Sequence, residues 1–255
     1  MALDVPFSRS DDRESGGKEE MPTLKCAART DIGRERENNE DAVVNRDNLA
    51  AVADGMGGAP GGEIASAAAA TLVESAFTGS SLDELTAAAR AANRTIWDRA
   101  RTEAGLEGMG TTLCAVGLLE TGSLAVVNVG DSRAYLWRGG SLRRLTDDHS
   151  ITAELLRRGE ITEEEAVDHP HRHILTRALG VAPTVEVDGC VHPVQDGDRL
   201  VLCTDGLFTE VQEEEIASVM ATDHDIAAAK DSLVELALSR GGHDNISVVV
   251  ADVRT

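Results

Sequence analysis

The residues of this sequence best suited to chemistry are acidic, and they stand beside glycine or asparagine at the ends of apolar segments. Four aspartates share this setting: Asp54, Asp131, Asp205 and Asp244. Each one by itself fits an ordinary turn, because Asp-Gly and Gly-Asp are common turn dipeptides. Four such sites at strand edges favour a functional cluster. Carboxylates without a nearby Cys or His select hard cations such as Mg²⁺ or Mn²⁺ over Zn²⁺.

The glycine-rich segment that follows Asp54 does not match a nucleotide loop. A P-loop needs Lys after its last Gly, and here Gly62 is followed by Glu63. The dinucleotide pattern G-x-G-x-x-G, counted from Gly55, reaches Pro60 instead of glycine. Bare glycine backbone around a carboxylate allows close approach to a cation. A structural turn and a metal site both remain open for this stretch.

The elements that must position these aspartates follow from the apolar periodicity. Strands are expected at 24–30, 42–44, 49–53, 111–119, 123–129, 133–137, 199–203 and 246–252. Helices are expected from after Pro60 to Ala76, from Ser81 to Ala104 with a Ser81–Glu84 capping pattern, and from about Asp223 to Ser239. This order is α+β, and two sheets packed face to face with helices outside satisfy it.

Composition limits the class of protein. The chain has 255 residues, 42% apolar and 27% charged, which are globular values. A net charge of -21 argues against nucleic-acid and anionic-membrane partners, both of which need basic patches. The four cysteines form no C-x-x-C pair, and no segment resembles a membrane span or a signal peptide, so we expect a cytoplasmic protein with reduced thiols. Residues 1–22 are polar and acidic and are expected to be a disordered tail.

Six motifs in order carry a resemblance to a known family. They are Arg36-x-x-x-Glu40-Asp41, Asp54-Gly55-Met56-Gly57-Gly58, Gly110-Thr111-Thr112, Gly130-Asp131-Ser132-Arg133, Thr204-Asp205-Gly206-Leu207 and Asp244-Asn245. The series resembles the bacterial branch of the metal-dependent protein serine/threonine phosphatases, the PPM or type-2C family. The resemblance extends from Thr23 to Asp252.

The resemblance implies a four-layer α-β-β-α sandwich, in which two antiparallel sheets are flanked by helices, with a binuclear Mn²⁺ or Mg²⁺ centre at one end. By position, Asp54 would bridge the two metals. Asp205 and Asp244 would complete one metal, and Glu40 with the Gly55 carbonyl would serve the other. Residues 23–255 would form a single catalytic domain.

Two further roles are implied in the same way. Asp131, together with Asp205, matches a third metal position described in bacterial relatives. Arg36 would bind the substrate phosphate, for which a planar guanidinium is well suited. Two close cations deprotonate a bridging water that attacks phosphorus in line.

One position departs from part of the family. Met56 stands where some eukaryotic members have a histidine proposed as the acid for the leaving group, so the proton donor is open between a metal-bound water and a histidine of residues 146–173. That segment carries short helical patterns and matches the family's mobile flap. Its cluster His169-Pro-His171-Arg-His173 could suggest zinc, but it lacks ligands at a suitable spacing and is interpreted as a solvated loop.

The leading function is therefore hydrolysis of phosphoserine and phosphothreonine in proteins by a monomer that opposes bacterial Ser/Thr kinases. One alternative is a regulatory phosphatase dedicated to a single signalling partner, such as an anti-sigma antagonist. A binding-only pseudophosphatase is the non-enzyme alternative. Its usual signature is a lost metal ligand, and Glu40, Asp54, Asp205 and Asp244 are all present.

Overall fold

The computed structural model describes residues 22–56 and 61–254. All of the expected tail except Pro22 lies outside these residues. Gly57 and Gly58, for which the sequence predicts close backbone approach to a metal, lie outside them as well.

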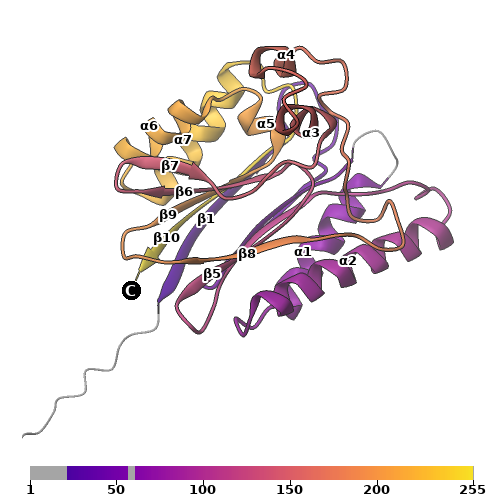
Figure 1. Ribbon diagram of the computed structural model, residues 1–255, viewed down its shortest axis with the longest axis horizontal. Helices are drawn as coiled ribbons and strands as arrows, with labels where there is room; N and C mark the ends of the chain where they lie inside the picture. Colours follow the sequence, from indigo (N-terminus) through magenta and orange to yellow (C-terminus); the bar gives the residue numbers. More distant parts are fainter. Residues whose placement is uncertain (1–21, 57–60, 255) are drawn as a thin grey trace, which may run out of the picture.

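Two five-stranded sheets form the centre of the structure, and every neighbouring pair of strands is antiparallel (Figure 1). The first sheet has the order β1 (Thr23–Asp31), β10 (Ile246–Arg254), β9 (Arg199–Cys203), β6 (Arg133–Arg138), β7 (Ser141–Arg144). The second has the order β2 (Asp41–Arg46), β3 (Leu49–Asp54), β4 (Leu113–Leu118), β5 (Ser123–Val129), β8 (Asp188–Pro193).

Helices cover the outer face of each sheet (Figure 1). The helices α1 (Gly62–Ala76) and α2 (Leu82–Thr102) pack on the second sheet, and α6 (Glu213–Thr222) and α7 (Ile226–Ser239) pack on the first. The short helices α3 (Ile151–Arg157) and α4 (Glu163–Val167) lie beyond one end of the sheets, and α5 (Asp205–Phe208) follows β9 directly. This is the four-layer α-β-β-α arrangement, so the predicted fold is confirmed.

The core has three apolar layers, because both faces of each central strand are buried. In β3, Ala50 and Val52 face the other sheet, whereas Ala51 and Ala53 face α1 and α2. In β10, Val249 belongs to the layer between the sheets. Strands buried on both faces read as continuous apolar runs, which is why the sequence locates them well.

The sequence predicts most elements to within a few residues and misses four. The last predicted helix begins at Ile226 rather than Asp223, because Asp225 is its N-cap. No strand was expected at β7 or β8, and no helix at α5 or α6. The predicted start of α2 is confirmed, since the Ser81 hydroxyl accepts a hydrogen bond from the Glu84 amide at 3.2 Å.

No helix in the described ranges 22–56 and 61–254 combines the length and the apolar character needed to cross a bilayer.

Close contact between α5 and the start of β10 gives the first testable prediction. A Cβ added at Gly206 would overlap the backbone carbonyl oxygen of Asn245, which cannot rotate away. We expect Gly206→Ala to lower the free energy of unfolding by about 1–3 kcal/mol, the usual cost of overpacking a core. Gly189→Ala is the control, because its Cβ would meet side-chain atoms only, those of Leu82 at 3.2 Å and of Thr86 at 3.6 Å. Urea unfolding of both variants measures the effect, and equal stabilities would contradict this reading of the contact.

Candidate metal centre

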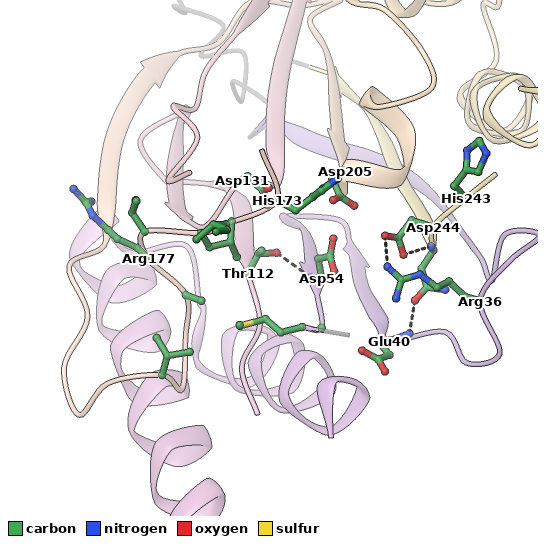
Figure 2. Close-up of a pocket in the computed structure, with 18 residues that line it drawn as sticks. Arg36, Glu40, Asp54, Thr112, Asp131, His173, Arg177, Asp205, His243 and Asp244 are labelled. Carbon is green, nitrogen blue, oxygen red and sulfur yellow. Dashed lines mark hydrogen bonds and ion pairs between the residues drawn. The ribbon is translucent and has the colours of Figure 1, made fainter. Parts of the chain in front are cut away.

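One pocket of about 800 Å³ lies at the end of the two sheets and contains every residue that the sequence assigns to the site (Figure 2). The assigned residues lining it are Arg36, Glu40, Asp54, Gly55, Asp131, Asp205 and Asp244. Figure 2 shows their carboxylates arranged around a common space, with Arg36 beside Asp244. The structure therefore brings together residues that lie more than 200 positions apart in the sequence.

The backbone of Asp54 is held by the two threonines of the Gly-Thr-Thr motif. The Asp54 amide donates to the Thr112 hydroxyl at 2.9 Å, and the Asp54 carbonyl accepts from the Thr111 hydroxyl at 2.7 Å and from the Thr112 amide at 2.8 Å. The next amide, of Gly55, donates to the Glu40 carbonyl at 3.1 Å. Asp54 is thus anchored on both sides at the last residue of β3.

Asn245 fixes the loop that carries Arg36 and Glu40. Its side-chain amide donates to the carbonyls of Ile32 and Asn38 at 3.0 and 2.9 Å, and its side-chain oxygen accepts from the Glu40 amide at 2.8 Å. Because Asn245 is buried and uses three hydrogen bonds, it ties this loop to the start of β10. Asn245 belongs to the Asp244-Asn245 motif, but the sequence alone did not indicate a role for it.

Asp205 is positioned by Thr204 immediately before it. The Thr204 hydroxyl donates to a carboxylate oxygen of Asp41 at 2.9 Å and accepts from the Ser247 amide at 3.0 Å. Thr204 thereby joins β2, β9 and β10 at one point. Since Thr204 is fully buried, this hydroxyl is a firm anchor for the Asp205 backbone.

Asp131 lies in a turn that is bonded on both sides. The Gly130 amide donates to Nδ1 of the buried His149 at 3.1 Å, and the His149 amide donates back to the Gly130 carbonyl at 3.0 Å. On the other side, the hydroxyls of Ser132 and Thr112 are 2.7 Å apart. The Asp54 and Asp131 segments are therefore connected through Thr112.

The carboxyl groups of the pocket have raised pKa values. Burial is the largest cause, and neighbouring carboxyls add to it. Burial followed by the charge of Asp205 raises the pKa of Asp131 to about 8, and burial raises that of Asp41 to about 8. The pKa values of Asp54, Asp205 and Glu40 are raised as well. The protein without bound cations therefore holds protons here at neutral pH.

The donor set fits hard divalent cations. Oxygen atoms of Glu40, Asp41 and Asp205 are buried and have no hydrogen-bond partner among the described residues. Such atoms are costly unless a cation or another donor meets them. In the described part of the chain, no three acidic, His or Cys side chains are already arranged to hold an ion. The unpartnered oxygens are the feature that fits a cation, because carboxylate oxygens are the ligands that hard divalent ions prefer.

Arg36 is engaged with one of these acids. Its Nη2 donates to Asp244 at 2.6 Å, while the other Asp244 oxygen accepts from the Asn245 amide at 2.7 Å. The remaining Arg36 N–H groups have no hydrogen-bond partner within the described residues, and the side chain is 42% exposed. A guanidinium with free donors at the mouth of the pocket is able to bind a phosphate.

Two histidines also line the pocket. His173 belongs to the His169–His173 cluster of the flap, and its side chain faces the pocket. The interpretation of that cluster as a solvated loop did not include this position. His243, which the sequence reasoning missed, has its pKa raised by a hydrogen bond to Glu210. The position of His243 directly before Asp244 is the sequence signal that could have identified it as a pocket residue. Met56 lines the pocket and offers no proton.

The beginning of the flap, before α3, is anchored to the neighbouring strand β6. Arg133 of β6 makes a two-pronged ion pair with the buried Asp148, with contacts of 3.1 and 2.7 Å. The same guanidinium lies 3.6 Å from the centre of the Phe208 ring. These contacts hold the base of the flap against the end of α5, close to Asp205.

An oxygen-only carboxylate site beside an arginine is typical of divalent-metal phosphoryl-transfer centres. Residues 33–238 match the family model described as protein phosphatase 2C, and the chain therefore belongs to that family. It is 41% identical over 242 residues to the serine/threonine phosphatase stp of Listeria welshimeri, covering 88% of this chain and 94% of that protein.

Solved structures agree with this membership. The crystal structure of the Mycobacterium tuberculosis serine/threonine phosphatase PstP/Ppp superposes with a TM-score of 0.85 at 41% identity, covering 91% of this chain and all of that one. A structure of the PstP catalytic domain in complex with two manganese ions superposes with a TM-score of 0.82 at 39% identity, covering 92% and 100%.

The raised pKa values predict how stability depends on pH without metal. An acid whose pKa is higher in the folded protein than in the unfolded chain destabilises the fold as it ionises. For Asp131 this loss of stability grows as pH rises from the unfolded pKa of 3.8 to the folded pKa of about 8. We expect Asp131→Asn in EDTA to exceed the wild-type Tm by a small margin at pH 5 and by a larger margin at pH 8. Each kcal/mol recovered adds about 2–4 °C in a chain of this size.

Asp98→Asn, on the exposed side of α2, is the control for loss of one charge. Its Tm should follow the wild type at both pH values. An Asp131→Asn protein that loses stability equally at both pH values would contradict the assignment.

Proposed function

We propose that this protein hydrolyses phosphoserine and phosphothreonine in proteins, with two Mn²⁺ or Mg²⁺ ions, and room for a third, held by the carboxylates of the pocket. The observation that carries the proposal is the convergence of five acidic side chains and Arg36 in one pocket of a protein phosphatase 2C fold. The names of the relatives support the activity, and the manganese-bound relative supports the cofactor.

The residue assignments form part of the proposal. Asp54 is the shared ligand, Asp205 and Asp244 hold one ion, and Glu40 with the Gly55 carbonyl holds the other. The rigid anchoring of the Asp54 backbone supports the bridging role, because a shared ligand must keep a fixed position. When bound, the metal pair supplies a water activated for attack on phosphorus.

Asp131 and Arg36 complete the assignment. Asp131 with Asp205 forms the third metal position. The charge of Asp205 contributes to the raised pKa of Asp131, which supports the proximity of the two side chains. Arg36 orients the phosphate through the N–H groups that Asp244 does not use. Met56 cannot protonate the leaving alkoxide. Of the four histidines in residues 146–173, His173 is the one that lines the pocket, so it is our candidate from that segment for the proton donor.

The wider role follows from the same activity. We infer that the protein opposes Ser/Thr kinases, works as a cytoplasmic monomer, and consists of one catalytic domain from 23 to 255 with a flap at 146–173. The free cysteines support a reducing location. A dedicated phosphatase for one signalling partner is the second candidate. The complete set of acidic ligands disfavours a pseudophosphatase.

The metal requirement is tested with a small aryl phosphate and a phosphothreonine peptide. Hydrolysis should require Mn²⁺ or Mg²⁺ and stop in EDTA. Asp244→Asn should lose most turnover and show a smaller rise in Tm on adding Mn²⁺. For the wild type this rise corresponds to about 2.7 kcal/mol at a hundredfold excess over Kd. Full activity after exhaustive chelation would refute the metal assignment.

The role of Arg36 is tested against a neighbouring arginine. Arg36→Ala should raise the activation free energy that corresponds to kcat/KM for a phosphopeptide by about 1.5–3 kcal/mol. The effect should appear mainly in KM, because a charged hydrogen bond to phosphate is lost. Arg34→Ala is matched in charge, but Arg34 binds the Leu238 carbonyl at 2.8 Å outside the pocket. Equal losses in both variants would place the phosphate site elsewhere.

A further inference from the structure

Part of the lining of the catalytic pocket is apolar, although His173, Thr176 and Arg177 line the pocket as well. The apolar residues include Met56, Ile174, Ala178 and Val181. Ile174 and Val181 are 46% and 45% exposed, which is unusual for large aliphatic side chains in this protein. Phosphate hydrolysis itself needs no apolar wall, so this surface is available to a different part of a substrate.

Gly110 lets this apolar wall continue away from the metal site. A Cβ at Gly110 would lie 2.7 Å from the Met56 sulfur and 3.0 Å from a Val181 methyl group, so the two side chains meet above this glycine. The Met56 amide also donates to the Gly110 carbonyl at 3.0 Å. Because Met56 follows Asp54 by two residues, the described apolar side chains Met56 and Val181 extend from the neighbourhood of the carboxylates past Gly110.

Val181 is also part of a second, smaller cavity. This cavity has about 370 Å³ and is lined by Trp97, Ala100, Gly108, Gly180 and Val181, with Arg101 and Glu107 at its edge. We call it the Trp97 groove. Its volume lies within the range of about 300–1,000 Å³ typical of ligand pockets. The Arg101 guanidinium lies 5.2 Å from the centre of the Trp97 ring, which holds one side of the groove.

The groove is built on rigid backbone. Asn93 of α2 is buried, its side-chain amide donates to the Ala182 carbonyl at 3.0 Å, and its oxygen accepts from the Gly180 amide at 2.9 Å. Leu179 exchanges two backbone hydrogen bonds with Thr111, at 3.1 and 2.8 Å. Val181 is therefore held from both sides, and binding against it costs little ordering of the loop.

We propose that the Trp97 groove receives an apolar side chain of the substrate polypeptide, a few residues away from the phosphorylated serine or threonine. This inference rests on the proposed protein phosphatase activity. Its support is the extension of the apolar lining from Met56 past Val181 to Trp97, because a chain whose phosphate is in the catalytic pocket must leave along one of its walls. A small aryl phosphate does not reach the groove.

The test uses the manganese-loaded full chain and phosphothreonine peptides. One leucine replaces serine at successive positions on either side of the phosphothreonine. We expect kcat/KM to rise about tenfold at positions on one side only, the ratio expected when most of a leucine side chain is buried. The readout is the ratio of leucine to serine peptide on the same enzyme preparation, so a general loss of turnover cancels.

Variants identify the groove as the source of the preference. Trp97→Ala and Val181→Ser should each bring the ratio to within about twofold of one, and Trp97→Phe should keep most of it. Ile174→Ser is the matched control. Ile174 has the same exposure as Val181 and lines the catalytic pocket, but it is not part of the groove, so the ratio should be retained.

The outcomes separate the groove from the proposed function. Equal kcat/KM at every leucine position, or a preference that Trp97→Ala and Val181→Ser leave unchanged, overturns the groove while peptide hydrolysis stands. Hydrolysis of aryl phosphate without hydrolysis of any phosphopeptide overturns the protein phosphatase activity and the groove together. Concentration-dependent dimerisation that Trp97→Ala abolishes, with no peptide preference, would assign the groove to a second copy of the chain and contradict the proposal.

Discussion

Mutual repulsion among buried carboxyl groups is the constraint on which this structure depends. Asp54, Asp131 and Asp205 share one pocket with raised pKa values, and the Arg36 guanidinium in the same pocket is already paired with Asp244. Such a cluster persists only if the fold is stable enough to hold it and if positive charge can enter it. The same property that destabilises the protein without cations creates its affinity for hard divalent ions.

The fold meets this constraint largely with hydrogen bonds from uncharged side chains rather than with counter-charges. Thr112 connects the Asp54 and Asp131 segments, Thr204 connects three strands beside Asp205, and Asn245 holds the loop of Arg36 and Glu40. These small polar side chains carry no charge and stand next to the ends of strands. The apolar residues of those strands lie in the three-layer core. The core thus supplies the stability, and the polar anchors supply the geometry.

The sequence predicted the fold, and the acidic residues that line the pocket, where residue type alone decides them. Buried strands such as β3 and β10 appear as apolar runs, and the acidic motifs stand out beside glycine. The edge strand β8 was missed because four of its six residues are exposed and its place depends on pairing with β5. The helix α6 was missed although Gln212 and Glu215 form a capping box. The anchoring roles of Thr112 and Asn245, and the Trp97 groove, depend on contacts between distant segments, which no local pattern contains.

The central claim is that these carboxylates together hold a pair of metal ions with Asp54 between them. Anomalous diffraction at the manganese absorption edge, from crystals grown with Mn²⁺, tests it most directly. The account predicts two strong peaks in the pocket, both within coordination distance of Asp54, one beside Asp205 and Asp244 and the other beside Glu40 and the Gly55 carbonyl. Peaks confined to other surfaces, or a pocket with Mn²⁺ bound away from Asp54, would contradict it.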